Sequence, residues 1–361
     1  MAYRLPKIPL LALCLLAACS AKLTRPVKEH AYFYVLRYQT SSIDIFDLGR
    51  TDGSLRFVSS FSTADTCPTP SRIAASPDGG FLFLSNPNSP STLAAYAITP
   101  GTGALTFVSS TEQSSGTASL LTSLDSRFLY VTSGGKISTF AINGGTLSQI
   151  GSPLTTPGGN LATLVAHPNG NFLYGESSGA TGAYALQIDP TTGALTLLGG
   201  VAPMGAIRLH PDGNSAIASL SIVGLTHYSI ELNSGLWSST GSLGLTPSMF
   251  ELDQSGRFLF AKTGSATLSV YRLQAGSGAL DSATPIGTLT HASFGGPTAG
   301  VLYFTRAGNI LVHRGGDGSE LTTLGFDTST GALSLTGASA TISGSAAIPK
   351  AVLVETTEPI P

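Results

Sequence analysis

Charge is scarce in this 361-residue sequence: Asp, Glu, Lys and Arg make up 11% of it, and the formal net charge is −2. A broad basic surface is therefore excluded, and we expect no nucleic-acid partner. Long charge runs and long segments of helical hydrophobic periodicity are also absent. Hydrophobic residues make up 42% of the chain. That content is ample for a core and excludes disorder over most of the length.

Cysteine is equally scarce, with three residues in the chain. Cys14 and Cys19 lie in an N-terminal segment that starts with two basic residues and continues as an apolar run over 8–18. This run is too short to span a bilayer and is typical of an export signal. Because these two cysteines belong to the signal, Cys67 remains alone and the mature chain has no internal disulfide.

Residues 16–19, which read LAAC, resemble a bacterial lipobox. We therefore predict a lipoprotein signal peptide over 1–19, with the lipid on the Cys19 thiol, and a polar tether over 20–30. The alternative is an ordinary secretory signal with Cys19 incidental. By analogy with Gram-negative sorting, Ser20 after the cysteine favours the outer membrane. The expected location is thus the cell membrane or the outer membrane, which the protein reaches through its lipid.

Cys67 has no second cysteine or neighbouring histidine with which to form a metal or redox site, so we interpret it as a quiet thiol in a loop or the core. Zinc-finger spacings are absent, and no motif for haem, nucleotide or metal binding occurs. We expect neither a cofactor nor a metal.

Glycine is plentiful, at 43 residues, and much of it belongs to one recurring phrase. The segment 70–110 is a full copy, in which alternation and turn residues predict four strands. Copies follow one another at roughly 43–50 residues, the length of one four-stranded propeller blade. In this interpretation each "TGAL" is the turn between the third and fourth strands of a blade. These turns build the fold and carry no chemistry.

The two ends of the chain predict how the ring closes. Residues 31–60 supply the second, third and fourth strands of a blade (b, c and d) with no first strand (a) before them. The segment 348–355, "IPKAVLVE", matches 69–76 and supplies the missing strand a. The sequence therefore predicts an all-β protein, a seven-bladed β-propeller forming a single domain over 31–356, with a tail at 357–361. Closure in this way leaves no open sheet edge at the seam.

The phrases "SPDGGFLFLSN" and "LAAYAITPGTGALTFVSS" resemble the seven-bladed β-propeller lactonase family, which includes 6-phosphogluconolactonase-type enzymes and carboxymuconate cyclases. The resemblance extends from residue 31 to about residue 356. It implies hydrolysis or formation of a sugar-acid or muconate lactone without a metal. The same repeat also occurs in related propellers that have no lactonase activity.

The resemblance also implies a Pro-Arg-His run shortly before a "His-Pro-Asp-Gly" turn. In "APMGAIRLHPDG" (202–213), the Arg and His positions are held by Gly205 and Ala206. Of the residues at these positions in other copies, Arg72 and Lys350 have the charge to stabilise an oxyanion. No histidine or carboxylate that could act as the base is found there.

Two charges interrupt apolar inner strands at equivalent positions of adjacent copies: Arg208 in "IRLH" and Glu251 in "FELD". We predict that they form an ion pair between blades, with a ligand site as the alternative. Together with Arg72 they are the candidate catalytic residues.

Other polar residues are predicted on the loops that rim the central channel. The candidates on this binding face are Glu176, His313, Arg314, Asp317 and Lys350. His167 and His210 precede turns and are interpreted as turn caps. "GESSG" formally matches a nucleophile elbow around Ser177 but lies between strands, so we treat the match as chance.

Two hypotheses about function follow. The first is a lipid-anchored binding or scaffold propeller at the cell envelope, whose partner is an envelope protein or a glycan. The second is a lactonase acting on a small lactone. In either case we expect a monomer. A WD-type repeat is a weaker interpretation, because the Trp-Asp signature is absent and Trp237 is the only tryptophan.

Overall fold

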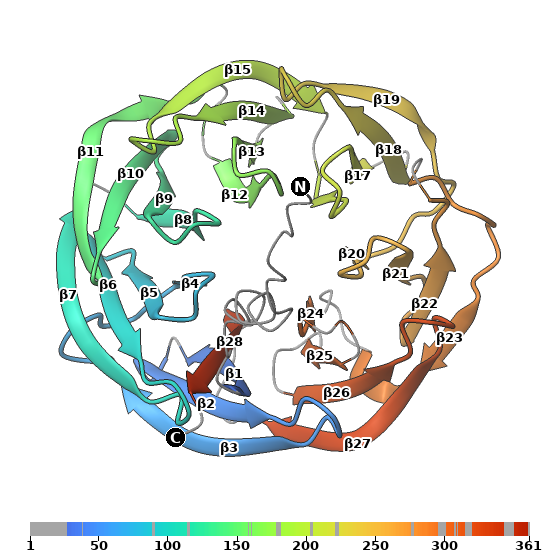
Figure 1. The fold of residues 1–361 in the computed structure, drawn as a ribbon, viewed down its shortest axis with the longest axis horizontal. Helices are drawn as coiled ribbons and strands as arrows, with labels where there is room; N and C mark the ends of the chain where they lie inside the picture. The colour runs from blue at the N-terminus through green and yellow to red at the C-terminus, as the bar shows by residue number, and fades with distance from the viewer. Residues whose placement is uncertain are drawn as a thin grey trace, which may run out of the picture.

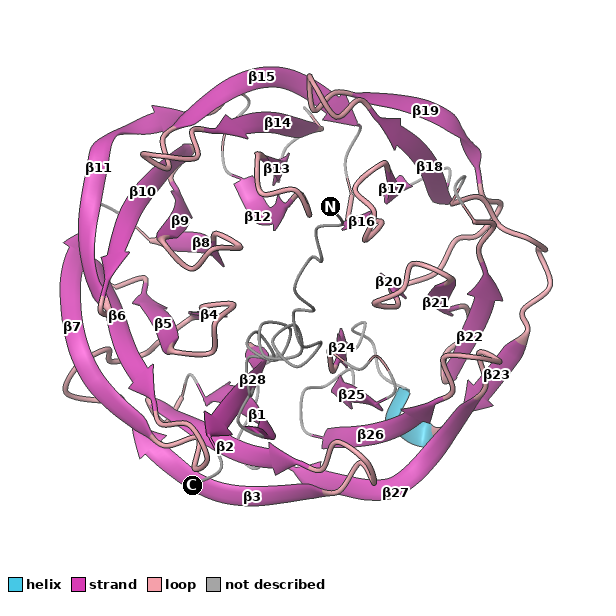
Figure 2. Cartoon of the chain, viewed as in Figure 1, coloured by secondary structure: helices cyan, strands magenta, loops and turns pink. Residues whose placement is uncertain are grey.

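The computed structural model describes residues 27–37, 39–88, 91–113, 116–157, 159, 161–177, 182–202, 205–220, 224–275, 278–294, 301–306, 308, 310–314, 320–342 and 350–359. In these residues the chain forms 28 β-strands and one short 3₁₀ helix, Ala292–Phe294 (Figure 2). No helix in this part of the chain has the length and hydropathy needed to cross a membrane.

The described strands form seven four-stranded antiparallel sheets arranged as a ring, which confirms the predicted all-β propeller (Figure 1). Blade 1 consists of β28 (Ala351–Pro359), β1 (Val27–Arg37), β2 (Ser42–Leu48) and β3 (Leu55–Ser62). Blades 2 and 3 consist of β4 (Arg72–Ala75), β5 (Phe81–Asn86), β6 (Ser91–Ile98), β7 (Leu105–Gln113), β8 (Thr117–Thr122), β9 (Phe128–Ser133), β10 (Lys136–Asn143) and β11 (Thr146–Thr155).

Blades 4 and 5 consist of β12 (Leu161–Ala166), β13 (Phe172–Ser177), β14 (Ala183–Ile188), β15 (Leu195–Ala202), β16 (Ile207–Leu209), β17 (Ser215–Leu220), β18 (Gly224–Ile230) and β19 (Trp237–Ser242). Blades 6 and 7 consist of β20 (Phe250–Leu252), β21 (Phe258–Lys262), β22 (Thr267–Arg272), β23 (Gly287–Thr290), β24 (Val301–Phe304), β25 (Ile310–Arg314), β26 (Glu320–Phe326) and β27 (Leu333–Thr341). In every blade the order a, b, c, d runs from the centre outwards (Figure 1).

The ring closes through β28, which pairs antiparallel with β1 from Val35↔Ala351 to Val27↔Pro359. The propeller therefore begins at Val27 and ends at Pro359. The expected limits of 31 and 356 were too narrow, and residues 27–30 and 357–359 are strand rather than tether and tail. These polar ends carry no hydrophobic alternation, but each supplies the other with backbone hydrogen-bond partners.

Glu355 on β28 ties three blades together at the seam. Its Oε2 accepts a 2.9 Å hydrogen bond from the backbone N–H of Arg306, in the turn that follows β24 of blade 7. The Arg306 guanidinium in turn donates from Nη2 to the carbonyl of Pro77, in the turn after β4 of blade 2, at 2.7 Å. The seam is thus held by side chains as well as by the strand ladder.

The recurring glycine of the turn between strands c and d packs against the preceding blade. At Gly103, where φ is +68°, a Cβ would lie 2.6 Å from the Tyr32 ring, and the Tyr34 hydroxyl donates a 2.8 Å hydrogen bond to the Gly103 carbonyl. Only glycine combines this φ with so close an approach. The same packing recurs for Gly193 on Phe128, Gly235 on Phe172 and Gly331 on Phe258. The repeat phrase is therefore an inter-blade contact.

Hydrophobic clusters fill the interfaces between neighbouring blades. Between blades 6 and 7, for example, the Phe260 ring lies 5.2 Å from that of Phe304 and 4.8 Å from that of Phe326. Cys67 is fully buried, as expected for a thiol in a loop or the core, and burial raises the pKa of its thiol to about 12.

The ring has two faces that differ in their connections. Strand b ends and strand c begins on one face, which we call the b–c face. The a-to-b and c-to-d turns lie on the other, which we call the a–b face. Alternate peptide groups of each innermost strand point towards the centre of the ring, because no further strand pairs with them there.

Candidate functional site

The last residue of strand b that faces the next blade is polar or charged in five of the six blades whose side chain at this position is described, although strand b is otherwise hydrophobic. It follows an aromatic or aliphatic residue two positions earlier on the same face. Its main chain pairs with the start of strand a, as Glu176 does with Thr163. The six residues, from blade 1 to blade 6, are Leu36, Ser85, Thr132, Glu176, Ser219 and Lys262.

Glu176 lies in strand β13, near the b–c face, and not in a loop as we expected. Its Oε1 accepts a 2.7 Å hydrogen bond from the backbone N–H of Ile207 in the next blade. Burial raises the pKa of Glu176. The hydrogen bond from Ile207, the charge of Arg208 and the hydroxyl of Thr163 oppose this shift. The strand continues through the glutamate because the neighbouring blade offers its carboxylate a donor.

Arg208 and Glu251 form the predicted ion pair between blades. Nε of Arg208, on β16, lies 2.6 Å from Oε2 of Glu251, on β20. Nη1 of Arg208 donates a 2.8 Å hydrogen bond to the carbonyl of Ile207. Both side chains are partly exposed, at 31% for Arg208 and 20% for Glu251. The pair therefore remains accessible to a small molecule at the centre of the ring.

Arg208 thus stands between two carboxylates that come from the blades on either side of it. Glu176, Arg208 and Glu251 form a line across blades 4, 5 and 6, which we call the Glu–Arg–Glu line. Among the described residues, Nη2 of Arg208 has no hydrogen-bond acceptor. The line therefore offers an N–H donor beside a partly buried carboxylate, the two groups that opening of an ester ring requires.

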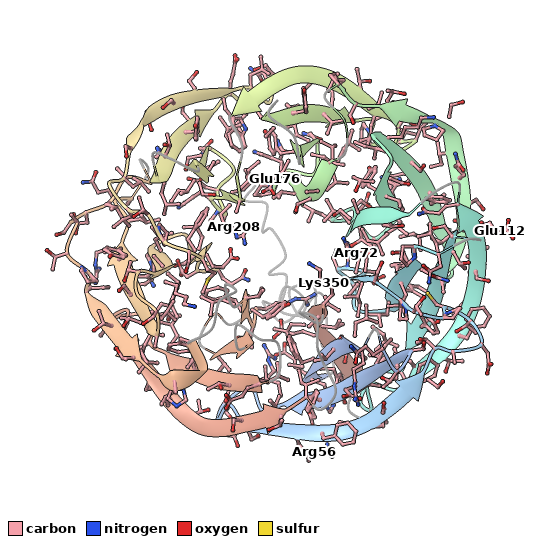
Figure 3. The ribbon with its side chains drawn as sticks, turned by 180° about the vertical axis from the view of Figure 1, so that it is seen from behind. Arg56, Arg72, Glu112, Glu176, Arg208 and Lys350 are labelled. Carbon is pink, nitrogen blue, oxygen red and sulfur yellow. The ribbon has the colours of Figure 1, made fainter. Side chains whose placement is uncertain are left out.

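Arg72 and Lys350 lie apart from this line. Figure 3 shows Glu176 and Arg208 together on one side of the ring's centre, and Arg72 and Lys350 together on another. Arg72 donates from Nε to the carbonyl of Ala118 at 2.5 Å and from Nη1 to that of Ser71 at 2.9 Å. Burial lowers the pKa of Arg72. Its guanidinium therefore joins blades 2 and 3 through backbone carbonyls.

Lys350 has the place in blade 1 that Arg72 has in blade 2. The N–H of Leu36 donates to the Lys350 carbonyl at 2.8 Å, as the N–H of Lys262 does to Met249 in blade 6. This register is shifted by one residue from the match of 348–355 to 69–76 expected from the sequence. Lys350 is exposed.

The other rim candidates are placed only in part. His313 and Arg314 belong to strand β25, and not to a loop as expected; the register Val301↔Arg314 gives Arg314 the place that Glu176 has in blade 4. Asp317 lies outside the described residues.

His167 and His210 cap turns, as predicted, and also join blades. His167 accepts at Nδ1 from the N–H of Asn169 at 3.2 Å, and its Nε2 lies 2.7 Å from the Gly213 carbonyl of blade 5. His210 repeats this with Asp212 and with Gly256 of blade 6. Ser177 ends strand β13 and lacks the helix that a nucleophile elbow needs.

A cavity lies away from the centre of the ring, at the b–c side of blades 1 and 2. It has a volume of about 600 Å³ and is lined mainly by hydroxyl, amide and carboxylate groups. They include those of Asp65, Thr69, Asn86, Asn88 and Glu112. We call it the rim cavity. None of the residues predicted from the sequence lines it.

No cluster of three or more His, Cys, Asp or Glu side chains suited to a metal ion occurs in the part of the chain that the structure describes.

Comparison with known proteins supports the family resemblance. Residues 25–115 match the family model described as "Lactonase, 7-bladed beta-propeller". The resemblance is therefore confirmed over these residues. No curated protein matches the sequence.

Solved structures share the fold over most of the chain. A proposed 6-phosphogluconolactonase from Bacteroides uniformis superposes with a TM-score of 0.72 at 17% identity, covering 90% of this chain and 99% of its own. One from Bacteroides fragilis gives 0.72 at 17% identity, with 90% and 98% covered. The periplasmic gluconolactonase of Pseudomonas aeruginosa gives 0.70 at 17% identity, with 91% and 99% covered. At this identity the similarity establishes the seven-bladed fold alone.

Proposed function

We propose that this protein is a lactone hydrolase that acts at the Glu–Arg–Glu line. The observation that carries the proposal is a partly buried carboxylate, Glu176, beside the guanidinium of Arg208, whose Nη2 has no acceptor among the described residues. Figure 3 shows both residues near the centre of the ring. The match of residues 25–115 to a lactonase family model supports this class of reaction. The proposed substrate is the lactone of a sugar acid or a related lactone.

Lactone hydrolysis forms a bond between a water oxygen and the carbonyl carbon, breaks the bond from that carbon to the ring oxygen, and delivers a proton to the ring oxygen. In the proposal, Glu176 accepts the proton from water and returns it to the ring oxygen. Burial shifts the pKa of Glu176 upwards, towards the operating pH at which a general base is most effective.

Arg208 is proposed to stabilise the charge that develops on the carbonyl oxygen, through its Nη2–H groups. Glu251 is a positioning residue, because its hydrogen bond with Nε fixes the plane of the guanidinium. The proposed residues are not those of the family's Pro-Arg-His run. In this chain Gly205 and Ala206 hold the Arg and His positions of that run.

The proposal can be tested by following acid release with a pH indicator on the full chain in detergent, using a panel of lactones that includes δ-gluconolactone. We expect Glu176→Gln to lower the rate by about 100-fold or more. Glu231→Gln, at an exposed glutamate in the turn after β18, is the matched control and should leave it unchanged. Failure of the wild-type protein to exceed the spontaneous rate with any lactone would falsify the proposal. A wild-type rate in Glu176→Gln would disprove the site but not the activity.

We also propose that the propeller is exported and anchored by a lipid on Cys19. The LAAC sequence at 16–19 supports this, and one structural relative is a periplasmic protein. Palmitate labelling of cells expressing the wild-type chain and Cys19→Ser tests the anchor. Equal labelling of both chains, or none of the wild type, would count against it.

A binding role at the cell envelope is the second candidate function. The rim cavity favours it, because a hollow of about 600 Å³ lined by hydroxyl, amide and carboxylate groups suits a polyhydroxylated ligand such as a glycan. Binding of the full chain to a glycan array, abolished by Asn88→Ala, would support this role. An array with no bound glycan would argue against it.

A further inference from the structure

Lys262 is a buried lysine that the Glu–Arg–Glu line does not use. It is the last residue of β21 and is 4% exposed. Among the residues that the structure describes, none accepts a hydrogen bond from its ammonium group or forms an ion pair with it. Most of the side chain is therefore removed from water, while its ammonium group has no protein partner among these residues, so an anion supplied from outside would compensate its charge.

The alternation of β21 places the Lys262 side chain in the interface between blades 6 and 7. Residues two apart on a strand share a face, so Lys262 lies on the face of Phe260. The Phe260 ring packs against Phe304 and Phe326 of blade 7. Lys262 therefore stands at the b–c end of this aromatic packing, where the interface opens towards the centre of the ring.

Glu251 shares this face, because it pairs directly with Phe260. Its carboxylate is turned to Arg208 of blade 5, where Oε2 accepts the 2.6 Å hydrogen bond. Arg208 thus neutralises Glu251, and Glu251 forms no ion pair with Lys262.

Blade 4 shows what the equivalent position does when it holds an acceptor. There Glu176 accepts the backbone N–H of Ile207 on the next blade's innermost strand. In blade 7, Leu302 has the place that Ile207 has in blade 5. Ile207 pairs with Ala218, the residue before Ser219 on strand b. Leu302 likewise pairs with His313, the residue before Arg314 on strand b.

The N–H of Leu302 points to the centre of the ring. The N–H of Thr305 donates to the Ile310 carbonyl within the blade. Alternation along β24 then turns the N–H groups of Phe304 and Leu302 away from β25. In blade 6, therefore, a lysine faces a backbone N–H where blade 4 has a carboxylate facing one. The register thus directs two donors, and no acceptor, to the same end of this interface.

We propose that Lys262 and the N–H of Leu302 form a binding site for a small oxyanion, a carboxylate or a phosphate. An oxygen of such an anion accepts from both donors, and its charge compensates the ammonium. The site does not rest on the proposed lactonase activity, because it is defined by binding alone.

The test is calorimetric titration of the full chain with inorganic phosphate, and separately with propionate, at low ionic strength. We expect saturable binding of at least one anion, weakened about ten-fold or more in Lys262→Met, which keeps the aliphatic stem. Lys136→Met, at an exposed lysine on β10, is the matched control and should bind as the wild type does. Absence of saturable binding to the wild type, or unchanged binding in Lys262→Met, would overturn the site.

Thermal melting is a second test, because it separates loss of the anion site from a folding defect in the variant. Lys262→Met should melt at a higher temperature than the wild type without anion, because it lacks a buried unpaired charge. The anion that binds should raise the melting temperature of the wild type and of Lys136→Met but not that of Lys262→Met. A Lys262→Met protein that melts lower than the wild type in anion-free buffer contradicts the proposal.

Discussion

Nε of Arg208 and Oε2 of Glu251 lie 2.6 Å apart although the two residues belong to different blades and are 43 positions apart in the chain. Each occupies the same place in its own innermost strand. Their contact shows that a ring of repeats can create a site simply by placing unlike charges at one position of adjacent copies.

The first prediction concerns the strength of this pair. A double-mutant cycle with Arg208→Met and Glu251→Gln should give a coupling energy of about 0.5–1 kcal/mol, because both side chains are partly exposed and solvent screens them. The measurement is the free energy of urea unfolding at low and high salt. A coupling that does not fall with added salt would show that the contact is not electrostatic.

The second prediction concerns pH. Burial raises the pKa of Glu176, so the folded protein binds a proton more tightly than the unfolded chain does. The stability contributed by this proton is complete below the unfolded-state pKa and is lost as the pH rises through the folded-state pKa. Glu176→Gln resembles the protonated form and keeps an oxygen for the Ile207 N–H. Its melting temperature should match the wild type near about pH 4 and exceed it near about pH 8.

The opposite trend, with the variant losing stability relative to the wild type as the pH rises, would mean that Arg208 outweighs burial at this carboxylate.

The third prediction compares two adjacent glycines in the turn between β10 and β11. Both have positive φ, but a Cβ at Gly144 meets nothing within 4 Å, whereas one at Gly145 would lie 2.7 Å from the Phe81 ring of blade 2. Gly144→Ala should cost about 1 kcal/mol from backbone strain. Gly145→Ala should cost about 1–3 kcal/mol more, because the ring must move. Chemical denaturation of both variants gives the comparison, and equal losses would refute the packing role.

The fourth prediction concerns Cys67. Its thiol is fully buried with a pKa raised to about 12, so iodoacetamide should leave it unmodified in the native protein. The measurement is the mass of the peptide that contains Cys67 after labelling. The chain unfolded in guanidinium is the positive control. Rapid labelling of the native protein would show that the loop carrying Cys67 opens readily.

Much of the fold could be predicted because one phrase recurs with its turn residues intact. Gly103 and its equivalents must be glycine for packing, so the phrase survives where strand residues vary. The ion pair of Arg208 and Glu251 was also predictable, because equivalent positions of adjacent repeats face each other. The ends of the ring were not: residues 27–30 and 357–359 pair only through their backbones, and backbone pairing leaves no pattern in side chains.

Sequence reasoning named Glu176 but expected it on a loop, and it did not name Lys262, for one physical reason. Glu176 and Lys262 each end an apolar run, and a charged residue after such a run usually indicates a loop. In this ring the strand continues through Glu176, because a neighbouring blade presents an N–H there. Aligning the copies on their turns and comparing the fifth residue of each strand b would have shown the series Ser85, Thr132, Glu176, Ser219 and Lys262.

The pairing of Val27 with Pro359 also fixes the face of the ring on which strand β1 starts. Strand β1 enters the ring from the a–b face, whereas Glu176, Lys262 and the rim cavity lie towards the b–c face. If the proposed lipid on Cys19 holds the chain on the side where β1 starts, the charged residues near the b–c face open to the surrounding medium. Substrate or ligand would then arrive from solution and not from the lipid surface.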